Sequence, residues 1–393
     1  MSPATVAAAY RTLKQRGLVN ASGRRGTTVA IQPPLRVLRT RTLPPGARDL
    51  ARGNPDPALL PPLGPALARI SPEHKLYGGP AKLDALVELA RDDFSADHVG
   101  GDVAIVGGAL DGVERVLQTR LLPGDRIAVE DPTWPRITDL VQALGYVPEP
   151  VEVDERGLLP DGLERALQRR ARAVIATPRG QNPTGAALDA DRSRQLRELI
   201  AQHPDVLVVE DDYVAAVAGA GYVPLHGSSQ HWAVIRSLSK VVGPDLRIAP
   251  MAGDPLTVSR VEGRQLLGPG WVSHLLQQLA AQLLGSASTR TLLARAERTY
   301  ATRRQALIDA LAELGIPAHG RSGLGVWVPL REEAATVQLL LERGFAVSPG
   351  ERYRFRTPPG IRVTTTTLEP SEARELAAAL AEITHAGTET YAG

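Results

Sequence analysis

The sequence predicts an α/β protein with a mostly parallel sheet flanked by helices and a smaller α+β domain at its C-terminal end. From about residue 75 to residue 285, short segments with apolar interiors alternate with helical stretches. Strands that are apolar on both faces are typical of parallel sheets covered by helices on both sides. After residue 286, a long Arg-rich helix leads into separate strand-like segments, which favours a second, smaller domain.

The elements follow in order along the chain. The expected sheet strands are VAIV (103–106), RIAVE (126–130), AVIAT (173–177), VLVVE (206–210) and WAVIRS (232–237). The helices expected between them include TDLVQALG (138–145), DGLERALQRR (161–170) and RSRQLRELIAQH (192–203). In the C-terminal part, the expected strands are GVWVPL (325–330) and GIRVTTTT (360–367). We therefore expect a large domain over residues 63–285 and a small domain over residues 286–393.

The first residues have a different pattern. In SPATVAAAYRTLKQRGLV, apolar residues recur close to the helix period, with basic residues between them. Ser2 is the expected N-cap, Pro3 the first helical residue and Gly17 the end of the helix. The hairpin-like LVNASGRRGTTVAI follows, and the Pro- and Arg-rich residues 33–62 are expected to form a linker or N-terminal arm.

Composition limits the possible functions. Apolar residues make up 43% and charged residues 22% of the 393, which is ordinary for a globular protein. The absence of cysteine excludes disulfides, thiolate nucleophiles and cysteine metal sites. No apolar run approaches the ~20 residues of a membrane span, and no signal-like segment opens the chain, so we expect a cytoplasmic protein. The net charge is only +2, but the first 41 residues hold eight Lys and Arg and no acid, which hints at nucleic acid.

Unusual residues follow the expected strands, where open α/β sheets bind their ligands. In VGGALDG, the backbone N–H groups of Gly108 and Ala109 could hold a phosphate at a helix N-terminus, although such a turn is often only a turn. DPTWPR places Trp134 in a proline-framed loop, and TPRGQNPTG supplies the amide of Asn182. We expect a ligand site where these loops meet.

Two further motifs add charge to the same edge of the sheet. VVEDDY ends an apolar strand with three acids in a row, which a buried strand avoids unless a cation is present. RSLSKVVGPDLR puts two hydroxyls, a lysine and an arginine after the next strand. The eight histidines show no pair at metal-ligand spacing, so we expect no metal site.

In their order and spacing, these motifs resemble the fold-type-I enzymes that use pyridoxal 5'-phosphate (PLP), the aminotransferase superfamily. The resemblance runs from about Leu50 to the C-terminus, and NPTG followed by SLSK with an arginine seven residues later is a specific signal. It implies a mostly parallel seven-stranded sheet flanked by helices. The opening helix and GPGWVSHLLQ narrow the resemblance to the MocR branch of the GntR regulators, in which a winged-helix domain is fused to an aminotransferase-like domain.

The resemblance assigns roles to individual residues. Lys240 would form the Schiff base with PLP, which needs a neutral amine and hence a lowered pKa. Asp211 would pair with the pyridine nitrogen, and Tyr213 and Asn182 would hydrogen-bond the phenolic oxygen. Trp134 would stack on the ring. The phosphate would be held by Ser237, Ser239, Arg247, Gly108 and Ala109.

Three more residues complete the implied site. Tyr77, in KLYGGPAKLDAL, matches a tyrosine that reaches the phosphate from a partner subunit, which implies a homodimer with shared active sites. Arg362, in PPGIRV, matches the arginine that grips the substrate carboxylate bidentately. Arg136 corresponds to an arginine that joins it in a GABA-responsive MocR relative, while an exposed, acid-paired loop arginine is an equally good interpretation. With both facing the pocket, a substrate with two anionic groups or an ω-amino acid is expected.

Two functions remain open. The first is a PLP-dependent enzyme acting on an amino acid or 2-oxo acid, most simply an aminotransferase, although elimination, decarboxylation or cyclisation use the same motifs. The second is a MocR-type regulator whose PLP domain senses an amino compound. Because Met1 directly precedes the expected recognition helix, either the true start lies upstream or residues 1–32 are a partial, vestigial winged-helix segment, and we expect the latter. On that ground we expect the enzyme rather than DNA binding.

Overall fold

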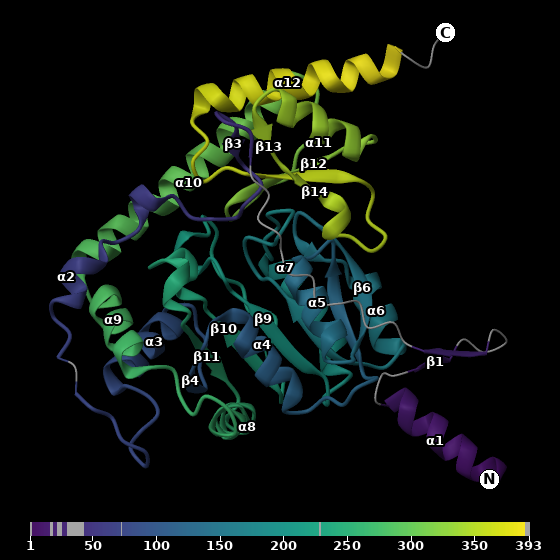
Figure 1. Cartoon of the computed structure of the whole chain (residues 1–393), viewed down its shortest axis with the longest axis vertical. Helices are drawn as coiled ribbons and strands as arrows, with labels where there is room; N and C mark the ends of the chain where they lie inside the picture. Colours follow the sequence, from purple (N-terminus) through teal and green to yellow (C-terminus); the bar gives the residue numbers. More distant parts are fainter. Residues whose placement is uncertain are drawn as a thin grey trace.

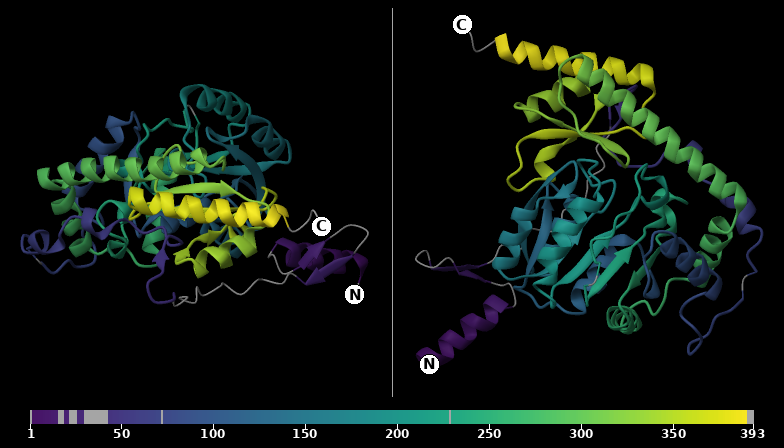
Figure 2. Two further views of the ribbon diagram at one scale, coloured as in Figure 1. Left: turned by 90° about the horizontal axis from the view of Figure 1, so that it is seen from above. Right: turned by 180° about the vertical axis from the view of Figure 1, so that it is seen from behind.

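The protein is built around one large sheet covered by helices on both faces, with a smaller domain against one end of the sheet (Figure 1). The computed structural model describes residues 2–15, 19–21, 26–29, 43–71, 73–227 and 229–389. The two further views show the same layers from above and from behind (Figure 2). The α/β class with a smaller C-terminal domain, expected from the sequence, is confirmed.

The large sheet has the strand order β4-β11-β10-β9-β8-β5-β6-β7. Its strands are β4 (Asp102–Val106), β5 (Arg126–Asp131), β6 (Val147–Asp154), β7 (Gly157–Leu158), β8 (Ala171–Ala176), β9 (Leu207–Asp211), β10 (Trp232–Ile235) and β11 (Ala249–Gly253). Strands β6, β5, β8, β9 and β10 run parallel, while β11 is antiparallel to both its neighbours. The two-residue β7 pairs antiparallel with β6 and extends the expected seven strands to eight.

All five strands expected in the large sheet are present, and two of the longer ones were missed. The missed β6 (VPEPVEVD) contains two prolines and acidic residues, and β11 (APMAG) contains Pro and Gly. Such residues are poor strand signals, because Pro cannot donate to the ladder and Gly packs nothing. These two strands owe their place to the neighbours that pair with them.

Helices cover both faces of this sheet. They are α3 (Asp84–Ala96), α4 (Ala109–Gln118), α5 (Pro135–Ala143), α6 (Pro160–Gln168), α7 (Ala190–Ala201), α8 (Pro255–Leu266) and α9 (His274–Leu284), with the short α2 (Leu63–Leu67) beside α9. In β4, Val103 and Ile105 join one apolar core, while Ala104 and Val106 join another. Both faces of the strand are therefore buried, as its unbroken apolar run indicates.

The small domain has its own core, and helix α10 (Ala287–Glu313) connects it to the large domain. The N-terminal half of α10 packs Leu293 and Tyr300 into the large-domain core, whereas Leu307 and Leu311 lie in the small-domain core. The other elements are β12 (Gly325–Pro329), β13 (Phe345–Ala346), β14 (Ser348–Pro349), β15 (Gly360–Thr364), α11 (Glu333–Glu342) and α12 (Pro370–Glu389). The expected boundary at residue 286 thus falls at the start of a helix that both domains share.

Part of the expected linker is structured. Strand β3 (Arg48–Asp49) pairs with β13 of the small domain. The backbone amide of Asp56 donates to the hydroxyl of Tyr300 at 3.0 Å, so this stretch is fixed to α10. Residues 30–42 lie outside the described part of the chain. The arm therefore joins the small domain before the chain enters the large one.

At the N-terminus, helix α1 (Pro3–Gln15) and the hairpin of β1 (Val19–Ala21) and β2 (Thr27–Val29) stand apart from the main body (Figures 1 and 2). Ser2 caps α1, because its hydroxyl accepts the amide of Thr5 at 3.3 Å. The expected end at Gly17 lies outside the described residues. The apolar side chains of Val6, Tyr10 and Leu13 are exposed.

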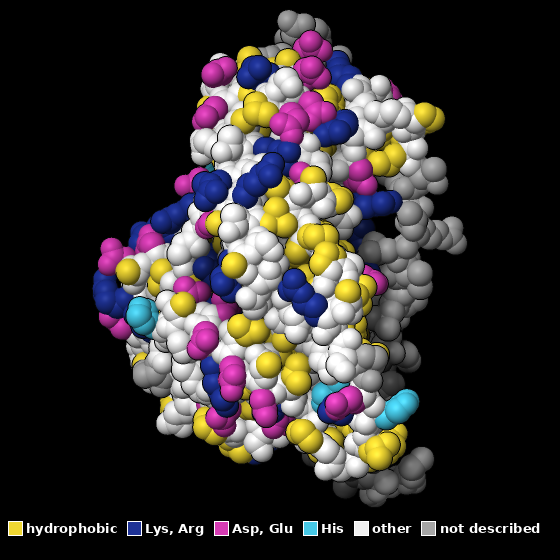
Figure 3. Space-filling view, turned by 90° about the vertical axis from the view of Figure 1, so that its left-hand side faces the viewer, with side chains coloured by type: hydrophobic (Ala, Val, Ile, Leu, Met, Phe, Trp, Pro, Cys, Tyr) yellow, Lys and Arg dark blue, Asp and Glu magenta, His cyan; other side chains and the backbone are white. Residues whose placement is uncertain are grey.

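The face over α2 and α9 exposes several apolar side chains, including Leu67, Leu76, Tyr77 and Leu275. Figure 3 shows this side of the molecule, where hydrophobic patches lie among basic and acidic side chains. Among the described residues, we find no helix with the length and apolarity of a membrane span. The same residues contain no group of three or more His, Asp or Glu that could hold a metal ion.

Candidate functional site

A cavity of about 1150 Å³ lies between the two domains, at the carboxyl ends of the parallel strands. Most of the site residues predicted from the sequence line this cavity. The predicted residues that line it are Ala109, Trp134, Arg136, Asn182, Asp211, Tyr213, Ser237, Ser239, Lys240, Arg247 and Arg362. Of the remaining two, Gly108 contacts Arg247 at its edge, and Tyr77 lies elsewhere on the surface.

The three acids that end β9 have different surroundings. Glu210 and Asp212 lie on one face of the strand and Asp211 on the other, because side chains alternate. The fully buried Glu210 accepts hydrogen bonds from the hydroxyl of Tyr222, two backbone amides and the ring of His226. These donors satisfy Glu210 without help from a ligand.

Asp212 is also fully buried and is balanced by two arginines. The guanidinium of Arg179 donates to it at 2.8 and 2.9 Å, and that of Arg236 donates at 2.9 Å. Both arginines also contact Asp97, so the charges form a network behind the sheet. Cations are therefore present near the three acids, as the sequence leads us to expect, but both arginines neutralise Asp212 rather than Asp211.

Asp211 faces the cavity and has an oxygen without a partner. Its Oδ1 is buried and accepts no hydrogen bond within the described part of the chain. Burial, together with repulsion from the carboxylates of Asp212 and Glu130, raises the pKa of Asp211 to about 7. A buried carboxylate of this kind needs a cationic or protonated partner to be stable as an anion. The carboxylate of Asp211 is thus suited to bind a ligand that carries a protonated nitrogen.

Lys240 follows β10 in the short helix η4 (Leu238–Lys240) and points into the same cavity. Burial, together with repulsion from the guanidinium of Arg362, lowers the pKa of Lys240 to about 8. Its ammonium donates to the carbonyl of Gly53. A lysine with this pKa offers a substantial neutral fraction near physiological pH, as a nucleophilic amine requires.

An anion-binding corner lies at the N-terminus of α4. Gly108 precedes the helix with a φ of 110°, and a Cβ built there would lie 3.0 Å from the guanidinium of Arg247. Glycine is therefore required both by the backbone and by the close approach of the arginine. Ser237 and Ser239 lie at the same corner, with their hydroxyls 2.9 Å apart. Hydroxyls, a guanidinium and a helix N-terminus together suit a phosphate.

The cavity wall also includes Trp134, Asn182 and Tyr213. Trp134 is the residue before α5 and lines the cavity, and the hydroxyl of Tyr213 donates to the carbonyl of Gly180 at 2.8 Å. Burial raises the pKa of Tyr213 well above its ordinary value, so the hydroxyl stays protonated and can donate. The carboxamide oxygen of Asn182 accepts from Arg362 at 3.1 Å.

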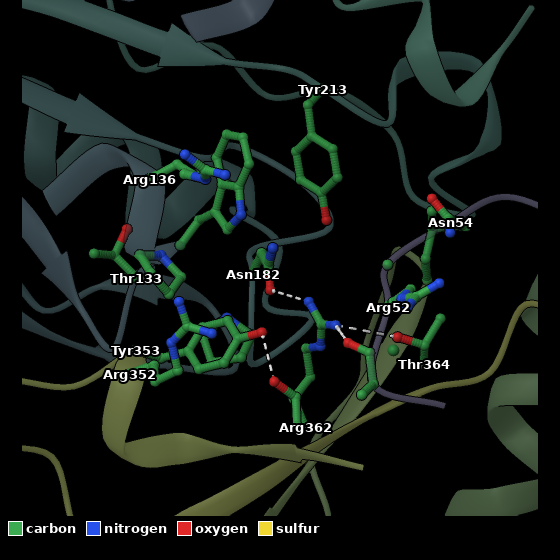
Figure 4. A pocket seen from close by; sticks show the side chains of 18 of the residues that line it. Arg52, Asn54, Thr133, Arg136, Asn182, Tyr213, Arg352, Tyr353, Arg362 and Thr364 are labelled. Atoms are coloured by element: carbon green, nitrogen blue, oxygen red, sulfur yellow. Dashed lines mark hydrogen bonds between the residues drawn. The ribbon is translucent and has the colours of Figure 1, made fainter. Parts of the chain in front are cut away.

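Arg362, on β15 of the small domain, enters the cavity from the opposite side. Its guanidinium lies between Asn182 and the hydroxyl of Thr364, which it reaches at 3.3 Å (Figure 4). It also donates to the carbonyl of Ala51 and lies over the ring of Tyr353 at 5.4 Å. The surrounding residues hold the guanidinium in one position, as recognition of a carboxylate requires.

A model of the aminotransferase class I and II family matches residues 50–380, which is most of the chain. The chain belongs to the class I and II aminotransferase family. It is 40% identical over 378 residues to the vitamin B6 salvage pathway transcriptional repressor PtsJ of Salmonella typhimurium, covering 95% of this chain and 88% of that protein. It is 29% identical over 343 residues to the pyridoxine biosynthesis regulator PdxR of Corynebacterium glutamicum, covering 80% and 72%.

Solved structures of this aminotransferase family share the fold. The kynurenine aminotransferase of Pyrococcus horikoshii superposes with a TM-score of 0.79 at 22% identity, covering 87% of this chain and 91% of that one. The α-aminoadipate aminotransferase LysN of Thermus thermophilus gives a TM-score of 0.77 at 23% identity, covering 88% and 94%. The expected fold type I and the MocR resemblance are confirmed.

Membership of the aminotransferase family implies PLP, and the residues fit it. The unpartnered oxygen of Asp211 suits a protonated pyridine nitrogen, and the corner around Gly108 and Arg247 suits a phosphate. Lys240 lines the same cavity as a partly neutral amine. These residues therefore suit the ring nitrogen, the phosphate and the aldehyde of PLP.

Sequence reasoning missed the residues that complete this aminotransferase-like cavity. Glu130, whose pKa burial raises to about 7, accepts from Thr177 and Gln181 and holds the loop that precedes Asn182. Arg352 and Tyr353 reach the cavity from a loop without a recognisable motif. Glu130 directly precedes the DPTWPR stretch, and a buried acid at a strand end was a usable signal.

Proposed function

We propose that this protein is a PLP-binding transcriptional regulator of the MocR type that controls the supply of vitamin B6. The similarity to PtsJ, at 40% identity over nearly the whole chain, supports a regulator better than the free-standing enzyme favoured by the sequence. The similarity to PdxR, a regulator of pyridoxine biosynthesis, supports a role in the supply of the same vitamin. Because a repressor of a supply pathway acts when its product is abundant, the PLP-loaded form should bind DNA more tightly.

The observation that best supports PLP binding is the difference between the surroundings of the three acids at the end of β9. Glu210 and Asp212 are satisfied by protein donors, whereas the buried Oδ1 of Asp211 is left for a ligand. When bound, PLP supplies an aldehyde and an electron-accepting ring. Lys240 would attack the aldehyde, and Asp211 would hold the proton on the ring nitrogen. Tyr213 and Asn182 would position the phenolic oxygen, with Trp134 against the ring.

The phosphate would lie against Ser237, Ser239, Arg247 and the backbone amides at the start of α4. Tyr77 supports a dimer in which each chain completes the other's site. It is 94% exposed and packs against the edge of Trp271, at a centroid distance of 5.6 Å. An aromatic side chain so exposed, on a face with other apolar residues, is typical of an interface. In the dimer, Tyr77 would reach the partner's phosphate corner.

DNA would be bound by α1 and the β1–β2 hairpin, as recognition helix and wing. The first 41 residues hold eight Lys and Arg and no acid, which favours contact with phosphates. Both elements project from the main body (Figure 1). This proposal replaces the expectation of a vestigial segment.

The proposal is tested with the full chain and a fluorescent duplex from the region upstream of its own gene, beside a scrambled duplex of equal length. We expect PLP to tighten binding of the first duplex about tenfold, within the usual range of an allosteric coupling. Added salt should weaken binding steeply. Lys240→Ala should still bind DNA but lose its response to PLP. Equal, weak binding of both duplexes by the loaded protein would contradict the regulator.

A second candidate, catalysis of amino-group transfer, is favoured by one observation. Burial lowers the pKa of Lys240 to about 8, and Lys240 lies in the same cavity as Arg362, so one residue would be able to move a proton and the other to hold a substrate carboxylate. Incubation of the loaded protein with single amino acids and 2-oxoglutarate, followed by mass analysis, would separate the two candidates. Sustained formation of glutamate would favour the enzyme.

A further inference from the structure

Residues 48–54 of the N-terminal arm are bound to the small domain. Strand β3 pairs with β13, and the carbonyl of Leu50 accepts the amide of Thr364 at 2.8 Å. The hydroxyl of Thr366 donates to the carbonyl of Asn54, also at 2.8 Å. The small domain thus supports this stretch at both of its ends, and the chain upstream of it leads to the β1–β2 hairpin and α1.

Between those ends, the arm crosses the cavity and meets Lys240 of the large domain. The ammonium of Lys240 donates to the carbonyl of Gly53, which lines the cavity together with Arg52 and Asn54. Figure 4 shows Arg52 and Asn54, which flank Gly53 in the chain, on the same side of the cavity as Thr364. Among the described residues, no other donor reaches this carbonyl, and the ammonium has no other hydrogen bond or ion pair. The contact therefore ties the arm, and with it the small domain, to the loop after β10.

The nitrogen that holds Gly53 is also the one that would bind PLP. Attachment forms a C=N double bond between Nζ and the aldehyde carbon, and the aldehyde oxygen leaves as water with two of the three ammonium protons. Nζ then keeps at most one proton, beside the phenolic oxygen that is ortho to the aldehyde, so the carbonyl of Gly53 loses its donor. The contact between the amide of Thr133 and the carbonyl of Tyr353, which also joins the two domains, involves no group that would bind PLP.

We propose that the contact between Lys240 and Gly53 is a latch between the large domain and the arm, and that attachment of PLP opens it. Opening frees the arm together with the small domain, and because the arm continues to the hairpin and α1, it changes how these elements meet DNA. The inference rests on the proposed function, because it names the step by which PLP would act on DNA binding. One hydrogen bond from an ammonium group is strong enough to shift the balance between two arrangements about tenfold or more.

Lys240→Met tests the latch in the absence of PLP, because methionine has a similar length but no donor. We expect hydrogen exchange of the amides in residues 51–56 to accelerate about tenfold or more relative to the wild type, since one charge-assisted contact is lost. The same variant should bind the upstream duplex without PLP as tightly as the loaded wild type does. Lys82→Met is the matched control, because Lys82 also donates to a backbone carbonyl, that of Val103 at 2.9 Å. It should leave the exchange and the affinity for DNA unchanged.

The wild-type protein supplies a second measurement that needs no substitution. Exchange is compared with PLP and with pyridoxine 5'-phosphate, which has an alcohol in place of the aldehyde and cannot attach to Lys240. Both compounds should slow exchange at the phosphate corner around Gly108, but only PLP should accelerate it at residues 51–56. Equal acceleration by pyridoxine 5'-phosphate would overturn the latch.

Two further outcomes would overturn the latch, and they differ from those that contradict the regulator. The first is unchanged exchange at residues 51–56 in Lys240→Met, and the second is a Lys240→Met variant that binds DNA as weakly as the wild type without PLP while PLP tightens the wild type. Loading is measured separately by borohydride reduction and intact mass. Failure to load, or DNA binding that does not respond to PLP, would count against the proposed function, and the exchange of Lys240→Met would still decide the latch.

Discussion

The two ends of the central cavity are assembled in different ways. The cofactor end, which comprises Asp211, Ser237, Lys240 and the corner at Gly108 and Arg247, comes from loops that follow strands of one sheet. The ligand end, which comprises Ala51, Thr133, Asn182, Tyr353 and Arg362, instead joins residues from the N-terminal arm, the large domain and the small domain. A parallel sheet gathers its carboxyl ends by its own geometry, whereas contacts between domains depend on how the domains pack.

The largest effect at the cofactor end is expected from substitution of Lys240. Lys240→Ala should lose all covalent attachment of PLP, because the Ala side chain has no amine. The measurement is the intact mass of the protein after borohydride reduction. Lys82→Ala removes a partly buried lysine that pairs with Glu262 elsewhere in the large domain, and it should still gain the mass of PLP. A mass gain in the Lys240→Ala variant would place the attachment at another lysine.

The next largest effect is expected at Asp211, where affinity and stability should change in opposite directions. Asp211→Asn should weaken PLP binding up to about a hundredfold, since a charge-assisted hydrogen bond is lost. The same change should raise the melting temperature of the PLP-free protein by about 2 °C or more at pH 8. Because burial raises the pKa of Asp211 from its ordinary value of 3.8 to about 7, the folded state loses stability as pH rises from about 4 to about 7, and the loss is complete above pH 7. The gain should vanish towards pH 4.

The adjacent Asp212 supplies the control for this prediction. Asp212→Asn removes the charge that balances the buried Arg179 and Arg236, so it should destabilise the protein by about 3–5 kcal/mol. Denaturant unfolding of both variants measures whether each substitution raises or lowers the free energy of unfolding. Equal destabilisation by both changes would show that Asp211 also has a structural partner, and the contrast along β9 would not identify the cofactor end.

The two ends also influence each other through electrostatic repulsion between Lys240 and Arg362. With its pKa at about 8, Lys240 becomes neutral above that pH, so the rate of PLP attachment should rise about tenfold per pH unit below 8 and level off above it. Arg362 contributes to the lowered pKa by repulsion. Arg362→Gln should therefore move the midpoint of the rate profile to higher pH and weaken binding of any carboxylate about tenfold or more. An unchanged midpoint would mean that burial alone lowers the pKa of Lys240.

The smallest effect is expected where the two domains meet beside the ligand end. The carboxylate of Asp131 accepts the amides of Phe355 and Arg356 at 2.8 Å and that of Thr357 at 3.3 Å. Asp131→Ala leaves these amides without their acceptor and should cost about 1–3 kcal/mol. Hydrogen exchange should then accelerate at residues 355–357 and not at the cofactor end. Uniform acceleration across the large domain would show that Asp131 stabilises the whole fold.

The sequence alone determined the class of the fold and most of the cofactor end. Unbroken apolar runs predicted buried parallel strands, and the motifs after those strands predicted neighbouring loops, because a parallel sheet brings its carboxyl ends to one edge. Lys240, Asp211 and Asn182 thereby reached one cavity as expected. Strands β6 and β11 were missed, since their prolines and glycine carry no strand signal of their own.

The tertiary structure explains why Asp211, rather than Glu210 or Asp212, faces the cavity without a protein partner, and it alone brings together the ligand end. The sequence shows three acids in a row, but their roles depend on Arg179, Arg236, Tyr222 and His226, which approach from distant parts of the chain. Likewise, Arg352 lines the cavity because its loop packs against Thr133 of the other domain. Local patterns encode the periodicity of elements, whereas partners separated by many residues are fixed by the packing of those elements, and that packing forms only when the whole chain folds.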